Sequence, residues 1–92
     1  MKVSPKAYTA VSNAIHSKSP AELREINDKN ELMMPFERYP DDKSLLSYLA
    51  REILDLAINS ARDHGKKIVT EIHVETLLRG KWADDQLREL FE

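Results

Sequence analysis

Residues 41–65 read DDKSLLSYLAREILDLAINSARDHG, and this stretch decides the fold of the 92-residue chain. Its apolar side chains recur every three or four residues, which is the period of a helix that buries one face. The acidic pair Asp41–Asp42 suits the positive end of a helix dipole, and Gly65 is the usual residue just past a helix C-terminus. The stretch therefore predicts one long central helix over residues 41–64.

The central helix has a broad apolar face. One stripe is formed by Leu45, Leu49, Ile53 and Leu56, and it is widened by Leu46, Ala50, Leu54, Ala57, Ile58 and Ala61. An apolar arc this wide is more than a contact between two helices needs. Because the chain is short, we expect a second copy to cover the face. The sequence thus predicts a homodimer, with its interface on Leu45, Leu49, Ile53 and Leu56.

Helix start and stop signals also flank the central helix. Ser4–Pro5 is an N-cap followed by proline at the first helical position, and Ser19–Pro20 with Glu22 adds a capping box. We expect further helices over residues 4–17, 20–28, 71–79 and 84–91. Their inward residues are expected to be Tyr8, Val11 and Ile15, then Leu23 and Ile26, then Val74, Leu77 and Leu78, then Leu87, Leu90 and Phe91. The prediction is a single all-α domain over residues 1–92, a small bundle of four to five helices.

The residues between these helices also have expected positions. Residues 28–39 show no clean period, and Met33, Met34 and Phe36 are expected to tuck this loop against the core, although methionines also suit an adaptable binding surface. Residues 66–69 are expected to form a short extended loop. Trp82 is expected to anchor the last helix.

Composition limits the classes of protein that the chain can belong to. Apolar residues make up 41% and charged residues 33%, which suits a globular domain and excludes a disordered chain. The absence of cysteine excludes disulfides and a thiolate nucleophile. The sequence has no apolar run long enough for a signal peptide or a membrane span. We therefore expect a cytoplasmic protein without membrane association.

Catalysis and metal binding find little support in the sequence. There is no P-loop or dinucleotide fingerprint, and no serine or threonine lies in a nucleophile motif. His16, His64 and His73 are widely spaced, and none has a second ligand at metal-binding spacing. The carboxylate pairs at 41–42 and 84–85 stand at helix starts, where the dipole disfavours a general acid. We expect no enzyme activity, no cofactor, no metal and no small-molecule substrate.

A basic segment follows the central helix. Residues 62–67 read RDHGKK, and Arg79 lies one short helix further on. The net charge of the chain is −2, so a contact with DNA would have to come from such a local patch. Lys66 and Lys67 have a second explanation, because cations after a helix C-terminus stabilise the helix dipole without any ligand.

Residues 53–69, ILDLAINSARDHGKKIV, resemble the end of the central helix and the second loop of the histone fold, as in archaeal and bacterial histone-like proteins. Residues 70–78 are similar to the start of the third histone helix, and residues 37–42 to the first loop. The resemblance implies a handshake dimer whose loops contact DNA phosphates and the minor groove without reading bases. Carried over by position, the contacts would be Arg38, Lys66 and Lys67, and Arg79, one short helix later, is expected to join them.

The chain departs from the histone pattern at three places. The central helix is about one and a half turns shorter than the family's, counted at 3.6 residues per turn. His73 stands where the family has an aspartate that pairs with a loop arginine, and Lys66 replaces that arginine. These departures put the internal clamp of the histone loops in doubt.

Overlapping residues also resemble a second family. Residues 54–64, with residues 69–74 and Leu77–Leu78, are similar to one repeat of the N-terminal domain of Clp ATPases, which binds substrates and adaptors. That domain is a tandem of two repeats, and only one is present here. This resemblance implies a monomer that binds one protein partner, as would a small phage or stress-response inhibitor, and no DNA.

Two hypotheses for a non-enzymatic binding protein remain open. The first is a histone-like homodimer that contacts the DNA backbone or a protein through its basic loop ends. The second is a monomeric protein-interaction module without affinity for DNA.

Overall fold

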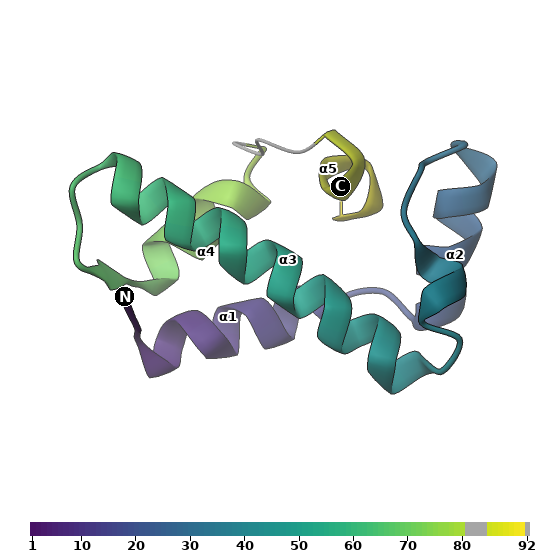
Figure 1. The fold of residues 1–92 in the computed structure, drawn as a ribbon, viewed down its shortest axis with the longest axis horizontal. Coiled ribbons are helices and arrows are strands. Elements are labelled where there is room, and N and C mark those ends of the chain that lie inside the picture. Colours follow the sequence, from purple (N-terminus) through teal and green to yellow (C-terminus); the bar gives the residue numbers. More distant parts are fainter. Residues whose placement is uncertain (81–84, 92) are drawn as a thin grey trace.

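The computed structural model describes residues 1–80 and 85–91 (Figure 1). Its helices are α1 Pro5–Ile15, α2 Pro20–Lys29, α3 Asp42–Asp63, α4 Glu71–Leu78 and α5 Asp85–Phe91, with a 3-10 turn η1 at Phe36–Arg38 and two short strands, β1 Lys2–Val3 and β2 Ile68–Val69. The predicted all-α bundle with a long central helix is confirmed. The expected helix over 84–91 begins at Asp85 in the described part, and residue 84 and Trp82 lie outside the described residues.

Side-chain caps set the helix starts where the sequence predicts them. The Ser4 hydroxyl accepts a hydrogen bond from the Ala7 amide at 3.1 Å, and the Ser19 hydroxyl accepts one from the Glu22 amide at 3.2 Å. The Asp41 carboxylate accepts from the Ser44 amide at 3.0 Å. Each cap satisfies an amide that has no partner inside its own helix, which is why the helices begin at these residues.

The core lies where α1, α3 and α4 meet. In Figure 1, α1 runs below α3, and α4 lies behind it. The side chains of α3 that are 0% exposed recur every four residues: Leu45, Leu49, Ile53, Ala57 and Ala61. Helix α1 contributes Ala7, Val11, Ala14 and Ile15, and α4 contributes Val74 and Leu77. Helices α2 and α5 pack against each other, with Leu23, Leu87 and Leu90 buried.

Some inward residues differ from those that the sequence predicts. Tyr8 is 56% exposed, because the buried face of α1 is centred one residue earlier, on Ala7 and Val11. In α2 the side chain of Asn27 is buried and Ile26 is only half-buried. In the loop that follows, Met34 and Phe36 fill the core as expected, whereas Met33 is exposed.

The strand pair β1–β2 joins the start of the chain to the segment between α3 and α4. The strands are parallel, with Lys2 opposite Ile68 and Val3 opposite Val69, and the Ser4 amide donates to the Val69 carbonyl at 2.9 Å. The expected extended loop over residues 66–69 is thus tied down by a pairing that the sequence did not predict. Because successive side chains of a strand point to opposite sides, Val69 is buried and Ile68 faces outward.

The described part is elongated, with extents of 37, 22 and 20 Å. Helix α3 defines the long direction, since 22 residues at 1.5 Å per residue give a length of about 33 Å. None of the described helices is both long enough and apolar enough to cross a membrane.

Candidate binding surfaces

The four cations predicted to contact DNA lie apart on the single chain. Arg38 ends the η1 turn just before α3, while Lys66 and Lys67 follow its C-terminus, so the length of α3 separates them (Figure 1). Arg79 is the C-cap of α4, at the end of that helix away from the two lysines. All four side chains are exposed. One copy of the chain therefore does not bring these residues into one surface.

The predicted dimer-interface residues lie mostly inside the chain's own core. Leu45, Leu49 and Ile53 are each 0% exposed, covered by the other helices of the same chain. Leu56 is half-buried. In this arrangement the first three leave no side-chain surface for a second copy to cover.

The three histidines make local hydrogen bonds within their own helices. In both His16 and His64, Nδ1 lies 2.7 Å from the carbonyl four residues earlier. Nδ1 of His73 accepts from the Thr70 amide at 3.0 Å and closes the start of α4. Within residues 1–80 and 85–91, no three His, Asp or Glu side chains are grouped as metal ligands would be.

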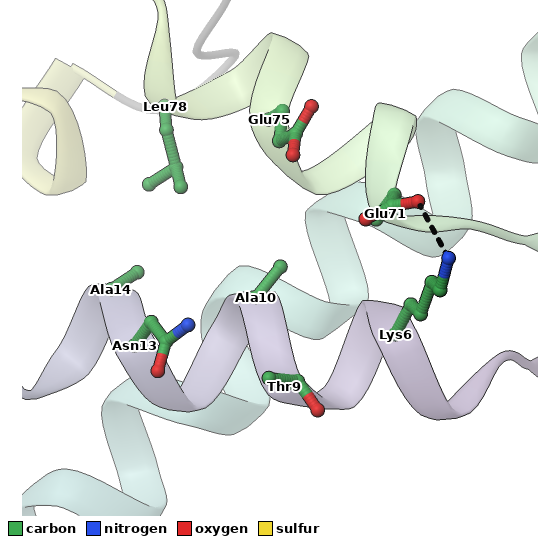
Figure 2. A pocket seen from close by; sticks show the side chains of 8 residues that line it. All are labelled: Lys6, Thr9, Ala10, Asn13, Ala14, Glu71, Glu75 and Leu78. Atoms are coloured by element: carbon green, nitrogen blue, oxygen red, sulfur yellow. Dashed lines mark ion pairs between the residues drawn. The ribbon is translucent and has the colours of Figure 1, made fainter.

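A groove of about 500 Å³ lies between α1 and α4 (Figure 2). Ala10, Ala14 and Leu78 point into it from the two helices, and an ion pair of 4.0 Å between Lys6 and Glu71 lies at one end. The remaining lining residues are Thr9, Asn13 and Glu75. The Thr9 hydroxyl donates to the Pro5 carbonyl at 3.1 Å, and no base among the lining residues is seen to take its proton. The groove offers an apolar recess with a polar rim and no arrangement for nucleophilic chemistry.

A hollow of about 470 Å³ lies between the end of α3 and the start of α4. Its lining, which we call the Lys–Ile surface, consists of Lys66, Lys67, Ile68, Thr70, Ile72 and His73. Ile72 is 66% exposed and Ile68 49% exposed. Among the described lining residues none is acidic, so two cations stand beside two uncovered branched apolar side chains.

Local backbone geometry holds the Lys–Ile surface in place. Gly65 has φ +69°, and the Lys66 amide donates to the Ala61 carbonyl at 2.8 Å while the Gly65 amide donates to Arg62 at 3.0 Å. These two hydrogen bonds form a Schellman motif, which ends α3 and turns the chain sharply. The parallel pairing of β2 with β1 then fixes Ile68 on the outer side. The two lysines are thus presented by an ordered turn.

A second hollow, of about 460 Å³, lies at the opposite end of α3. We call it the Arg–Tyr groove, and it is lined by Arg38, Tyr39, Pro40, Asp41, Lys43, Ser44, Ser47, Tyr48 and Arg51. Of these residues, the sequence predicts a ligand contact only for Arg38 and a helix-capping role for Asp41. The spacing of Lys43, Ser47 and Arg51 by four residues was a readable signal for one face of a helix. The approach of Tyr39 to Tyr48 depends on the loop before α3 and had no local signal.

Hydrogen bonds set the charge state of Asp41 in this groove. The Ser44 hydroxyl donates to its carboxylate at 2.8 Å, and this bond, together with the one from the Ser44 amide, lowers the pKa of Asp41 below its ordinary value of 3.8. Asp41 is consequently an ionised helix cap, as the sequence predicted for this carboxylate pair, and not a proton donor.

Comparison of the chain with protein-family models, with curated protein sequences and with solved structures gives no significant match. The histone-like and Clp-like resemblances therefore stay expectations. A function can be proposed only from the side chains on the surfaces described above.

Proposed function

We propose that this protein is a monomeric protein-interaction module that binds an acidic, apolar segment of a partner through the Lys–Ile surface. The observation that carries the proposal is the exposure of Ile72 and Ile68 beside Lys66 and Lys67. Isolated exposed apolar residues are ordinary, but two in one hollow, rimmed by cations and with no acidic residue in the lining, are typical of a protein-binding site.

Burial within one chain supports the monomeric form of this proposal. A handshake dimer needs the apolar face of its central helix to be open to the second copy. Here α1, α2 and α4 all contact α3, and the row that includes Leu45, Leu49 and Ile53 is already buried within one chain. The chain does not need a partner subunit to bury its core.

The test uses two designed peptides labelled with fluorescein, one alternating Glu with Leu and the other alternating Lys with Leu. We expect the Glu–Leu peptide to bind at least about tenfold more tightly, because the lysines complement its charge and the isoleucines its leucines. Equal binding of both peptides, or no binding of either, would contradict the proposal.

Ile72→Asp is the decisive variant, with Met33→Asp as its matched control. Both changes place a carboxylate at an exposed apolar position, and residue 72 lies in the first turn of α4, where an acidic side chain suits the helix dipole. We expect Ile72→Asp to weaken binding of the Glu–Leu peptide by about tenfold or more and Met33→Asp to leave it unchanged. The same loss in both variants would count against the Lys–Ile surface.

A second candidate function follows the histone-like resemblance. All four predicted cations are exposed, and a dimer could bring Arg38 of one copy near Lys66 and Lys67 of the other. This candidate requires a dimer that persists on dilution and binds duplex DNA with a steep dependence on salt. Light scattering on a sizing column decides between the two: a mass near the 10.6 kDa of one chain supports the interaction module, and a mass twice that supports the histone-like dimer.

A further inference from the structure

The Arg–Tyr groove, at the N-terminal end of α3, gathers three cations. Arg38, Lys43 and Arg51 are all exposed, and none of them forms an ion pair within the part of the chain that the structure describes. Lys43 and Arg51 lie eight residues apart on α3, which places them about 12 Å apart along the helix. Ser47, one turn from each, adds an exposed hydroxyl between them. The groove thus presents a row of hydrogen-bond donors longer than one phosphate group.

The Arg–Tyr groove also contains a negative charge, which caps the start of α3. Asp41 is the one acidic side chain among the described lining residues, and it accepts hydrogen bonds from both the amide and the hydroxyl of Ser44. Its charge stabilises the start of α3 and offsets one of the three cations. Three cations against one carboxylate leave the lining with a net positive charge, which attracts an anion.

A pair of aromatic rings stands beside these cations. Tyr39 and Tyr48 are stacked, with ring centroids 4.5 Å apart and an angle of 17° between the ring planes, and both residues are half-buried. The Arg24 guanidinium, on α2, donates to the Tyr39 carbonyl at 2.8 Å and to the Pro40 carbonyl at 3.2 Å, which ties the loop that carries Tyr39 to α2. A preformed aromatic pair next to a basic row is the combination that binds a planar ring attached to a phosphate.

We propose that the Arg–Tyr groove binds a segment of single-stranded nucleic acid. Phosphates would contact Arg38, Lys43 and Arg51, and an unstacked base would lie against the tyrosine pair. A row of about 12 Å exceeds one phosphate, which favours a strand over a free mononucleotide. Bases inside a duplex are stacked on each other and cannot reach the rings, which favours a single strand over duplex DNA. This site is separate from the Lys–Ile surface, so either proposal can fail without the other.

The test measures fluorescence anisotropy of a labelled thymidine oligonucleotide of about 15 nucleotides at several salt concentrations. We expect saturable binding whose logarithm falls with the logarithm of salt concentration with a slope of about −2, as three phosphate contacts on a single strand require. No saturable binding, equal or tighter binding of a duplex of the same length, or complete competition by an equimolar mononucleotide would overturn the proposal.

Two matched double variants locate the binding. Lys43→Glu with Arg51→Glu, and Lys66→Glu with Lys67→Glu, change the net charge by the same amount, the first pair in the Arg–Tyr groove and the second beyond the C-terminus of α3. We expect the first to lose at least about tenfold in affinity and to reduce the magnitude of the salt slope to below about 1, because two of three contacts are gone. We expect the second to bind within about twofold of wild type. Equal losses in both would mean that only overall charge matters, and that result would overturn the site.

Tyr39→Leu tests the aromatic part. Removing one ring should weaken binding about fivefold or more without changing the salt slope, since stacking releases no counterions. A circular dichroism melt of each variant confirms that it is folded. If a folded Tyr39→Leu variant binds as wild type does, the base is not held by the rings and the single-strand assignment is wrong.

Discussion

The two ends of α3 carry similar positive charge, but aromatic side chains lie beside it at one end and aliphatic side chains at the other. Toward the N-terminal end, Arg38, Lys43 and Arg51 line one groove with a stacked tyrosine pair; at the C-terminal end, Lys66 and Lys67 line a hollow with two exposed isoleucines. Positive charge alone would favour any anion at both ends. The apolar neighbours distinguish them, because flat rings suit nucleic-acid bases and branched aliphatic groups suit the apolar side chains of a protein segment.

The largest expected effect is a loss of stability when the core that supports both ends of α3 is changed. Leu49→Ala should lower the free energy of unfolding by about 3 kcal/mol, because a fully buried leucine is replaced by a cavity. Leu46→Ala, at a half-buried position of the same helix, should cost clearly less. Urea unfolding followed by circular dichroism at two protein concentrations measures both, and we expect no dependence on concentration. A midpoint that rises with protein concentration would show that a second copy completes the core.

Titrating each of the two double variants with both ligands tests whether the two ends of α3 bind independently. The variant reversed at Lys66 and Lys67 should lose at least about tenfold in affinity for the Glu–Leu peptide and keep the thymidine oligonucleotide, whereas the variant reversed at Lys43 and Arg51 should do the opposite. Anisotropy titrations of both variants with both ligands give four affinities. If one variant loses both ligands, the two ends do not act as separate sites.

The turn after α3 should matter for one end only. Gly65→Ala places a side chain at φ +69°, where no heavy atom lies within 4 Å of the new methyl group, so the cost is the backbone conformation alone, about 1 kcal/mol. Gly65→Asn should cost less, because asparagine tolerates this conformation. We expect Gly65→Ala to weaken peptide binding while oligonucleotide binding stays the same. Equal stability of the glycine and alanine proteins in thermal unfolding would argue against the positive φ.

The smallest expected effect concerns the pH dependence of the Asp41 cap. The pKa of Asp41 is lowered in the folded protein, so its ionised form contributes stability above its ordinary value of 3.8, and this contribution is lost as the pH falls through the folded-state pKa. Asn caps a helix about as well but carries no charge. Urea midpoints from pH 2 to 7 should therefore show wild type above Asp41→Asn at neutral pH, with the difference vanishing in acid. A difference that persists at pH 2 would contradict the charge as its cause.

The sequence predicts those elements whose causes are local. Ser4, Ser19 and Asp41 each place a side-chain acceptor at a helix start, and Gly65 supplies the backbone conformation that ends α3, so these boundaries were readable. The pairing of Lys2–Val3 with Ile68–Val69 joins segments far apart in the chain and left no local pattern. That pairing fixes Ile68 outward, so the place of Ile68 in the Lys–Ile surface has no local signal in the sequence.

The broad apolar face of α3 shows what reading one helix at a time leaves open. The broad apolar face of α3 was recognised correctly, but its period does not say whether the covering helices come from the same chain. Here the row through Leu49 is buried within one chain, and in α1 Ala7 is buried where the sequence favours Tyr8. The Arg–Tyr groove was missed for a related reason, since Tyr39 reaches Tyr48 only through the path of a loop.

The most direct test of two separate binding ends is a pair of titrations followed in the amide spectrum of the isotope-labelled protein. The Glu–Leu peptide should shift the amides of residues 66–73, and the thymidine oligonucleotide those of residues 38–51, with both ligands able to bind at once. If both ligands shift the same amides, or if the first ligand excludes the second, the ends of α3 are not two sites of different specificity.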